Sequence, residues 1–318
     1  MGSRVILNLV LCFLVVLSCS CNSCYGSARK LTALYKPPPM VLKYHNGKLL
    51  EGNLPVSILW YGKFTSTQKS IVSDFFLSLN PTSRNHLQHS SKTTTNPYVS
   101  HWWETVQTYM KNAQKKQTHI ILSKQTTDEK YSLGKSLTRS QISELSQRVN
   151  SKPGTITLVL TDKDVTVEGF CMSSCGFHGS NKMKNSAFIW VGNSVTQCAG
   201  QCAWPFHQPI YRPQDKPLVA PNGDVGVDGM IMNIASLLSG TVTNPFGNGY
   251  FQGTANAPLE VSSACPGVYG KGAYPGYAGN LLRDTDTGGS YNAHGVNGRK
   301  YLLPALFNPT TSECSTLV

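Results

Sequence analysis

The cysteines in the second half of the chain place the strongest constraint on its fold. Two pairs share one spacing, in CMSSC at 171–175 and CAGQC at 198–202, and two single cysteines follow. An even set of cysteines in an exported protein indicates disulfides, although the sequence cannot choose among the pairings. We therefore predict three disulfides among Cys171, Cys175, Cys198, Cys202, Cys265 and Cys314.

Zinc coordination is the alternative use of these cysteines, because a histidine follows each pair. His178 lies three residues after the first pair, and His207 lies five residues after the second. Common zinc knuckles have two residues between their cysteines, whereas both pairs here have three. We therefore favour disulfides, interpret both histidines as structural, and expect no metal and no cofactor.

The N-terminal sequence indicates the compartment in which the chain folds. Arg4 precedes an unbroken apolar run over residues 5–17, and small residues occupy 26–28. The run is shorter than the roughly 20 apolar residues of a membrane-spanning helix, and the pattern is typical of a secretory signal. We predict a signal peptide over 1–28 and a secreted protein with no membrane span after its removal. A retained N-terminal anchor is the alternative.

Basic residues are concentrated in the N-terminal half of the chain. Residues 29–150 contain 17 Lys and Arg against 6 Asp and Glu, whereas residues 151–318 contain 10 of each group. Such an asymmetry favours an anionic partner, and outside the cell an acidic cell-wall polysaccharide is a better match than nucleic acid. A solvated basic face without a specific partner is the alternative.

Apolar periodicity predicts strands that alternate with helices. Strands are predicted at 53–62, 118–123, 155–160 and 187–192, with the first cysteine pair in a loop between the last two. Helices are predicted at 65–79, 100–111, 138–149 and 229–245. Capping boxes formed by Thr65 with Gln68 and by Thr138 with Gln141 open the first and third of them.

This order of elements predicts an α/β fold, with a mixed α+β fold as the alternative. We expect a mainly parallel sheet with helices on its faces, followed by a Gly- and Pro-rich, disulfide-stapled C-terminal half. Residues 29–52, which include three consecutive prolines, are expected to form an extended arm. Residues 53–318 are expected to form a single domain.

The familiar catalytic motifs are absent from the sequence. A zincin peptidase carries HExxH on a helix, but the buried helix has Ser236, Leu237 and Gly240 and no His, Glu or Asp over 229–240. A zincin-like topology without HExxH is therefore one interpretation of the fold. The sequence also lacks the nucleophile elbow and the P-loop and Rossmann fingerprints, so no catalytic residue is predicted.

Two acidic segments carry weaker signals. Asp162, Asp164 and Glu168 include candidates for a glycosidase carboxylate pair, but acids after a strand are more often loop or capping residues. Asp284 and Asp286 begin a calcium-like loop that lacks its final Glu. Asp286 also opens a single Asp-Thr-Gly triplet, whereas aspartic proteases need two carboxylates.

Aromatic residues, several of them in Gly-rich loops, are better candidates for ligand binding. Exposed rings offer large contact areas at low entropic cost and can stack on the faces of sugars. Core packing remains the default expectation for most, but not all, of this set: Trp102, Trp103, Trp204, Tyr250, Phe251, Tyr269, Tyr274 and Tyr277.

Several long segments carry a family resemblance. VTVEGFCMSSCGFHGS, CAWPFHQPIYRPQ and GVNGRKYLLPALFNPTTSECSTLV occur in this order, and with their surroundings from about residue 31 onward they resemble the plant EXORDIUM family, also called phosphate-induced proteins. The resemblance implies a plant protein exported to the apoplast and cell wall and associated with growth, cell expansion and hormone or nutrient signals. It implies no established catalytic residues.

These observations lead to one expected function and two alternatives. We expect a secreted, non-enzymatic protein of the apoplast and cell wall that promotes growth and binds acidic wall polysaccharide through its basic N-terminal half. The first alternative is a wall-modifying hydrolase on a degenerate metallopeptidase-like scaffold. The second is an extracellular signalling ligand for a cell-surface receptor.

Overall fold

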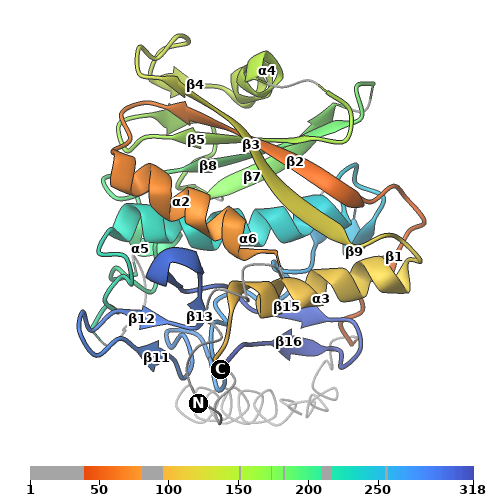
Figure 1. The fold of residues 1–318 in the computed structure, drawn as a ribbon, viewed down its shortest axis with the longest axis vertical. Coiled ribbons are helices and arrows are strands. Elements are labelled where there is room, and N and C mark those ends of the chain that lie inside the picture. The colour runs from red at the N-terminus through yellow and green to blue at the C-terminus, as the bar shows by residue number, and fades with distance from the viewer. Residues whose placement is uncertain are drawn as a thin grey trace, which may run out of the picture. The chain divides into compact units, whose positions relative to one another are not determined.

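The predicted apolar strands lie side by side in a five-stranded sheet in the computed structural model (Figure 1). Its order is β3 (Thr118–Asp128), β2 (Gly52–Tyr61), β5 (Ile156–Thr161), β8 (Ser186–Gly192) and β7 (Gly176–Asn181). The first four strands are parallel, and β7 pairs antiparallel with β8. Every residue of β5 and β8 is buried, which explains their continuous apolar sequences.

The structure describes residues 39–80, 96–149, 152–172, 174–181, 183–209, 216–254 and 257–318. The predicted signal peptide lies outside the described residues, as do residues 29–38 of the predicted arm. Residues 40–318 form one unit with a continuous set of contacts. Within it, Leu42, Leu49 and Leu50 are buried in the main hydrophobic core.

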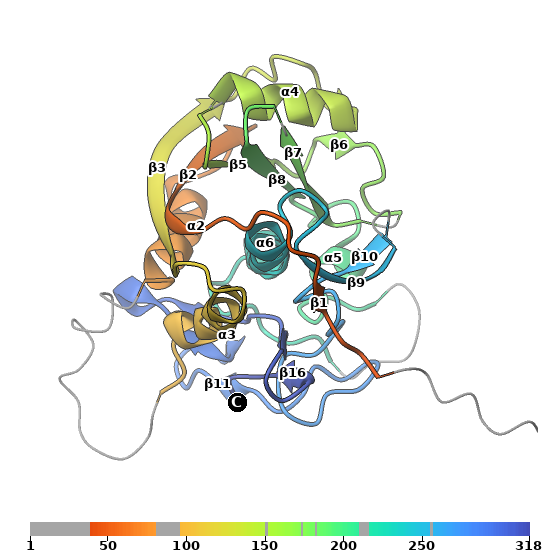
Figure 2. The same ribbon diagram turned by 90° about the vertical axis from the view of Figure 1, so that its right-hand side faces the viewer.

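Helices cover both faces of the sheet (Figures 1 and 2). On one face lie α2 (Ser66–Ser78) and α6 (Val225–Thr243), with α3 (Val99–Asn112) beyond them, and on the other lies α4 (Arg139–Val149). Strand β2 divides its side chains between two hydrophobic cores, one on each face of the sheet. Val56, Ile58 and Trp60 join the core with α2, α3 and α6, whereas Leu59 and Tyr61 join the core with α4.

Both predicted capping boxes are confirmed. The Thr65 hydroxyl accepts from the Gln68 amide at 3.2 Å, and the Gln68 side chain accepts from the Thr65 amide at 3.0 Å. The same reciprocal pair forms between Thr138 and Gln141, at 3.2 and 2.8 Å. These bonds satisfy backbone amides that have no partner within the helix, so each helix begins where the sequence predicts.

The buried helix α6 is the centre of the unit and appears end-on in Figure 2. It begins at Val225, where the Asp224 side chain accepts from the Val227 amide at 3.0 Å. Among the described helices, α6 is long and apolar enough to cross a membrane, but 78% of its apolar window is buried inside the protein. It therefore has the character of a core helix.

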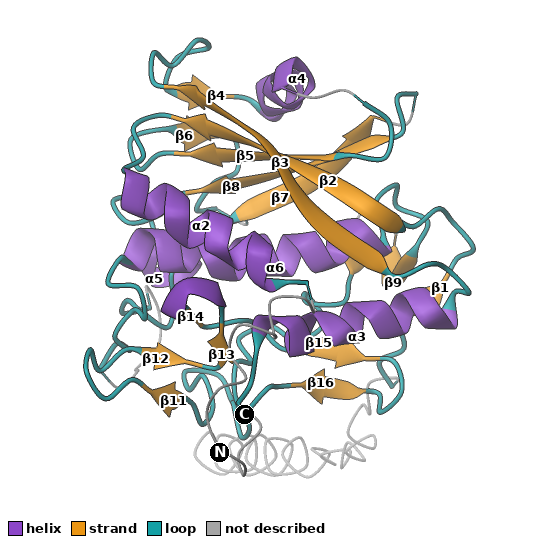
Figure 3. Ribbon diagram, in the orientation of Figure 1, coloured by secondary structure: helices purple, strands orange, loops and turns teal. Residues whose placement is uncertain are grey.

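Beyond α6 the chain is mostly loop with short strands, as Figure 3 shows. Antiparallel pairs join β1 (Lys43–Tyr44) to β9 (Tyr250–Thr254), β9 to β10 (Ala257–Leu259), β11 (Leu282–Arg283) to β12 (Ser290–Tyr291), β13 (Ala293–His294) to β14 (Lys300–Tyr301), and β15 (Leu306–Asn308) to β16 (Glu313–Ser315). A parallel pair joins β4 (Ser136–Leu137) to β6 (Thr166–Val167), and η3 (Val296–Gly298) is a short 3-10 helix. The Tyr109 hydroxyl of α3 donates to the Phe307 carbonyl at 2.6 Å and joins this layer to the core.

The prediction of a mixed α/β chain with a stapled, loop-rich C-terminal half is confirmed, and the five-stranded sheet is partly parallel. The prediction of a loop between 160 and 187 misses β7, which pairs with β8 from Gly176 to Asn181. Its sequence, GFHGSN, has few apolar residues because β7 is an edge strand of the sheet and is only half-buried.

Candidate functional site

Three disulfides use the six cysteines singled out in the sequence. Cys171 bonds Cys198 and Cys175 bonds Cys202, so both pairs join the segment before β7 to the short helix α5 (Ala199–Cys202). The third disulfide joins Cys265 to Cys314 in the C-terminal layer. Among the described residues, no group of three or more His, Cys, Asp or Glu side chains is arranged to hold a metal ion.

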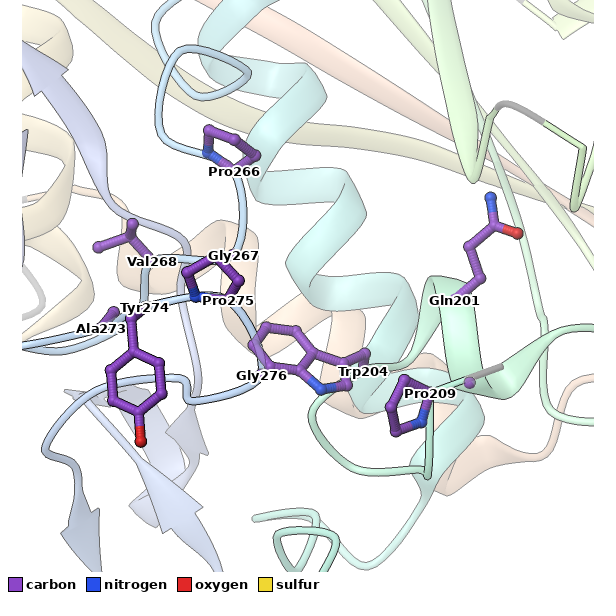
Figure 4. Close-up of a pocket in the computed structure, with 11 residues that line it drawn as sticks. Gln201, Trp204, Pro209, Pro266, Gly267, Val268, Ala273, Tyr274, Pro275 and Gly276 are labelled. Atoms are coloured by element: carbon purple, nitrogen blue, oxygen red, sulfur yellow. The ribbon is translucent and has the colours of Figure 1, made fainter. Parts of the chain in front are cut away.

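A pocket of about 510 Å³ opens between the two stapled segments (Figure 4). One wall comes from α5 and the residues after it, and the other comes from the loop after Cys265. None of the described residues that line it has a charged side chain. The lining residues are Gly200, Gln201, Trp204, Pro209, Pro266, Gly267, Val268, Ala273, Tyr274, Pro275 and Gly276.

The first wall of the pocket is fixed to the core helix. Asn233 of α6 donates from its side-chain amide to the Cys202 carbonyl at 2.8 Å, next to the disulfide of Cys202. The Trp204 ring lies 6.0 Å from the Tyr269 ring, measured between centroids. Gly267, on the opposite wall, has a φ of +73°, a backbone conformation that glycine adopts readily.

The second wall is a closed loop. The amide of Tyr274 donates to the Tyr277 carbonyl at 3.1 Å, and the amide of Tyr277 donates back at 2.8 Å. Ala305 donates to the Val268 carbonyl at 2.8 Å, so a neighbouring segment also holds this wall. Tyr274 itself is 64% exposed. The pocket therefore has an exposed aromatic ring on a backbone that is fixed at both ends.

A second cluster surrounds Glu260, which the sequence analysis did not single out. Nε2 of His178, on β7, lies 3.0 Å from Oε2 of Glu260, and the Asn244 side chain donates to Oε1 at 2.7 Å. Close by in the sequence of both segments, the hydroxyl of Ser236, on α6, donates to the hydroxyl of Ser262 at 2.7 Å. No sequence signal relates His178 to Glu260, because 82 residues separate them.

The two histidines grouped in the sequence analysis have different partners. His178 is held by Glu260, whereas His207 is exposed and its Nδ1 lies 3.0 Å from the Gln208 carbonyl oxygen. Nδ1 of His178 is buried and has no hydrogen-bonding partner among the described residues.

The candidate glycosidase carboxylates bind separate local groups. Asp162 accepts from the amides of Lys63 and Lys163, at 3.1 and 2.7 Å, and Glu168 accepts from the Arg139 amide at 3.1 Å. Burial raises the pKa of Asp164, but hydrogen bonds from Lys135 and Tyr131 outweigh it and leave the pKa below its usual value. A general acid in glycoside hydrolysis needs a raised pKa, so Asp164 is poorly suited to that role.

In the calcium-like loop, other groups of the protein already bind the carboxylate of Asp284. Oδ1 of Asp284 accepts from the amides of Asp286 and Thr287, at 2.9 and 2.8 Å, which closes a tight turn. Its other oxygen pairs with the Lys300 ammonium group. The carboxylate that would be the first calcium ligand is therefore neutralised by a lysine.

The structure describes 12 of the 17 basic residues in the N-terminal half and all 6 acidic ones, which gives a net charge of +6 over its described residues, 39–80 and 96–149. Lys111 and Lys116 are exposed at the end of α3, and Lys124 and Lys130 are exposed on and after the edge strand β3. Among the basic residues of this half that the structure describes, Lys135 forms a side-chain ion pair with Asp164 and Arg148 forms one with Glu144.

Comparison with known sequences shows which family the chain belongs to. The family model described as "Phosphate-induced protein 1 conserved region" matches residues 42–317. The chain belongs to the phosphate-induced protein family. Its relatives include Protein PHOSPHATE-INDUCED 1 of Nicotiana tabacum, 58% identical over 94% of this chain and 95% of that protein, and Protein EXORDIUM of Arabidopsis thaliana, 56% identical over 92% and 94%. No solved structure matches the chain.

The phosphate-induced protein region contains every feature described above. It includes both walls of the pocket, the three disulfides, and the cluster of His178, Asn244 and Glu260. Protein EXORDIUM-like 2 of Arabidopsis thaliana, 54% identical over 90% of this chain and 92% of that protein, also matches across this region. The resemblance inferred from the sequence is thus confirmed at the level of the family.

Proposed function

We propose that the protein is secreted to the apoplast, acts in the plant cell wall without catalysing a reaction, and binds acidic wall polysaccharide through its basic N-terminal half. The observation that carries the proposal is the separation of charge along the chain. Residues 29–150 have an excess of 11 basic residues, and residues 151–318 are balanced. A polyanion concentrates against such a surface through long-range attraction.

The exposed lysines near β3 are one part of this surface that the structure describes. Lys111 and Lys116 at the end of α3 are close in sequence and exposed, and Lys124 projects from the edge strand β3. An edge strand exposes its backbone as well as its side chains, so a linear polymer could lie along it. Lysine presents a flexible point charge, which suits repeated carboxylates of variable spacing.

A role in growth and cell expansion under hormone or nutrient control is the wider part of this proposal. Its support is membership of the family, in which one relative is named Protein PHOSPHATE-INDUCED 1. Binding to wall polymers supplies a physical link to expansion, because those polymers determine how far the wall extends. A signalling ligand for a surface receptor would use the same secreted protein with a different partner.

A hydrolase on a zincin-like scaffold is the second candidate, and one observation favours it. Helix α6 packs under β8 and the antiparallel edge strand β7, beside the pair formed by His178 and Glu260. A zincin carries its HExxH motif on such a helix, but α6 presents Ser236 and Gly240 there. We therefore treat this scaffold as one that lacks the zinc ligands of a peptidase.

Elution from isolated cell walls tests the polysaccharide proposal. At 1 M salt the Debye length falls to about 3 Å, so binding through the lysines should be lost as salt rises. The variant Lys111→Glu/Lys116→Glu/Lys124→Glu should elute at lower salt than the parent protein. The matched control Lys184→Glu/Lys216→Glu/Lys271→Glu changes three exposed lysines of the C-terminal half and should elute like the parent. Retention that is independent of salt and of both variants would refute the proposal.

A further inference from the structure

The pocket between α5 and the loop after Cys265 differs in chemistry from the basic surface. Its described lining contains aromatic, proline and glycine residues with one amide side chain, Gln201, and no ionisable group other than the Tyr274 phenol. A charged ligand would lose water there without gaining a counter-ion, which is costly. The pocket is therefore suited to an uncharged ligand.

We propose that this pocket binds a neutral oligosaccharide of the β-glucan type, independently of the acidic polymer proposed for the N-terminal half. In a β-glucan the ring substituents are equatorial, so both faces of each sugar ring are flat and present C–H groups. Such faces match exposed aromatic rings. The hydroxyls project around the ring edge, where they need groups that both donate and accept hydrogen bonds.

Tyr274 and Trp204 supply the aromatic contacts. Tyr274 is 64% exposed although it is a large ring, and the reciprocal backbone bonds with Tyr277 hold its loop. Trp204 is half-buried and lies between Pro209 and Pro275 in the view of Figure 4. A sugar that enters the pocket can contact one exposed ring and one half-buried ring. Aromatic side chains provide this area with little loss of entropy.

Gln201 and the Tyr274 hydroxyl supply the polar contacts. An amide side chain offers both donors and an acceptor, and a phenol hydroxyl offers one of each. Neither group is hydrogen-bonded to another described side chain or backbone group in the structure. Both can therefore serve sugar hydroxyls. A proline-rich peptide, which also binds aromatic-lined grooves, has few donors and would leave the amide oxygen of Gln201 without a partner.

Size and rigidity agree with a saccharide site. A volume of about 510 Å³ lies within the usual range of ligand pockets, about 300–1,000 Å³. The disulfides of Cys198 and Cys202 fix one wall, and the Cys265–Cys314 disulfide fixes the start of the other. Because the walls are already ordered, less entropy is lost when a ligand binds.

Calorimetric titration of the full, oxidised protein tests the proposal with three probes: cellohexaose, an oligogalacturonide and a proline-rich peptide. We expect cellohexaose to bind with an affinity that does not change with salt, since none of the lining residues that the structure describes is charged. Tyr274→Ala should weaken this affinity about tenfold, the effect of losing roughly one aromatic stacking contact. Tyr274→Phe should retain most of it, because the ring face remains.

Tyr274 is exposed, so its substitution leaves the core intact, and Met183→Ala is the matched control. Met183 is 95% exposed and does not line the pocket, so this variant should bind cellohexaose like the parent. The proposal is overturned if cellohexaose shows no binding, if Tyr274→Ala binds it unchanged, or if the proline-rich peptide alone responds to Tyr274→Ala. Oligogalacturonide binding that depends on salt but not on Tyr274 concerns the basic surface and leaves the two sites distinct.

Discussion

Nε2 of His178 lies 3.0 Å from Oε2 of Glu260, and this contact joins the edge strand β7 to the loop that follows β10. The Asn244 side chain, at the end of α6, donates to the other oxygen of the same carboxylate at 2.7 Å. Glu260 is only 9% exposed. One buried carboxylate thus holds together the sheet, the core helix and the C-terminal layer.

Replacement of this carboxylate should destabilise the protein. Glu260→Ala leaves the buried donor of Asn244 and the His178 ring without their acceptor, and each unpaired buried group costs about 1–3 kcal/mol. Denaturant unfolding monitored by tryptophan fluorescence measures the loss. Glu129→Ala, at an exposed position, is the control and should change the free energy of unfolding by less than about 0.5 kcal/mol. Equal stability of the two variants would contradict this role.

Gly240→Ala should also destabilise, although alanine normally favours a helix interior by about 0.5–1 kcal/mol. A methyl group at this position would overlap Oε2 of Glu260, which is held by His178 and Asn244 and cannot move freely. In a Glu260→Ala background the clash is removed, so Gly240→Ala should become neutral or stabilising. A double-mutant cycle measures this coupling, and additive effects of the two substitutions would rule the clash out.

The disulfide pairing can be checked by peptide mapping without reduction. We expect three linked peptides, joining Cys171 to Cys198, Cys175 to Cys202 and Cys265 to Cys314. The last pair encloses a separation of 49 residues, so Cys265→Ser/Cys314→Ser should lower the free energy of unfolding by about 4 kcal/mol in the chain-entropy view. Free thiols in the native protein, together with bound zinc, would instead support the metal alternative.

Because Asp228 is buried, its protonation should make the folded protein more stable at mildly acidic pH than at neutral pH. Burial raises its pKa to about 7, although hydrogen bonds from Asn222 act in the opposite direction. The unfolded chain has the ordinary value of 3.8, so between these values the folded state binds the proton more tightly. The stabilisation that this proton gives to the folded state is fully present below about pH 4 and is lost as the pH rises through about 7.

The difference in unfolding free energy between the parent protein and Asp228→Asn, measured from pH 4 to 8, isolates this contribution. Relative to the variant, the parent should lose stability as the pH rises. Asp286→Asn, at an exposed position, is the control and should follow the parent curve. A difference that stays constant with pH would show that the buried carboxyl does not titrate in this range.

Local features of the sequence determined much of the secondary structure. The two capping boxes placed the starts of α2 and α4 correctly, because each motif is complete within four residues. Continuous apolar runs identified β5, β8 and α6, because these elements are buried on all sides. The even set of cysteines predicted three disulfides, since the number of bonds depends only on the count and the compartment.

Only the tertiary structure decided which distant residues meet. The disulfide pairs, the edge strand β7 and the contact of His178 with Glu260 depend on the path of the chain, and no local pattern records it. The pocket has the same origin, because its walls come from the segments around Trp204 and Tyr274. Periodicity and caps act over a few residues, whereas a site forms where separate segments pack against one core helix.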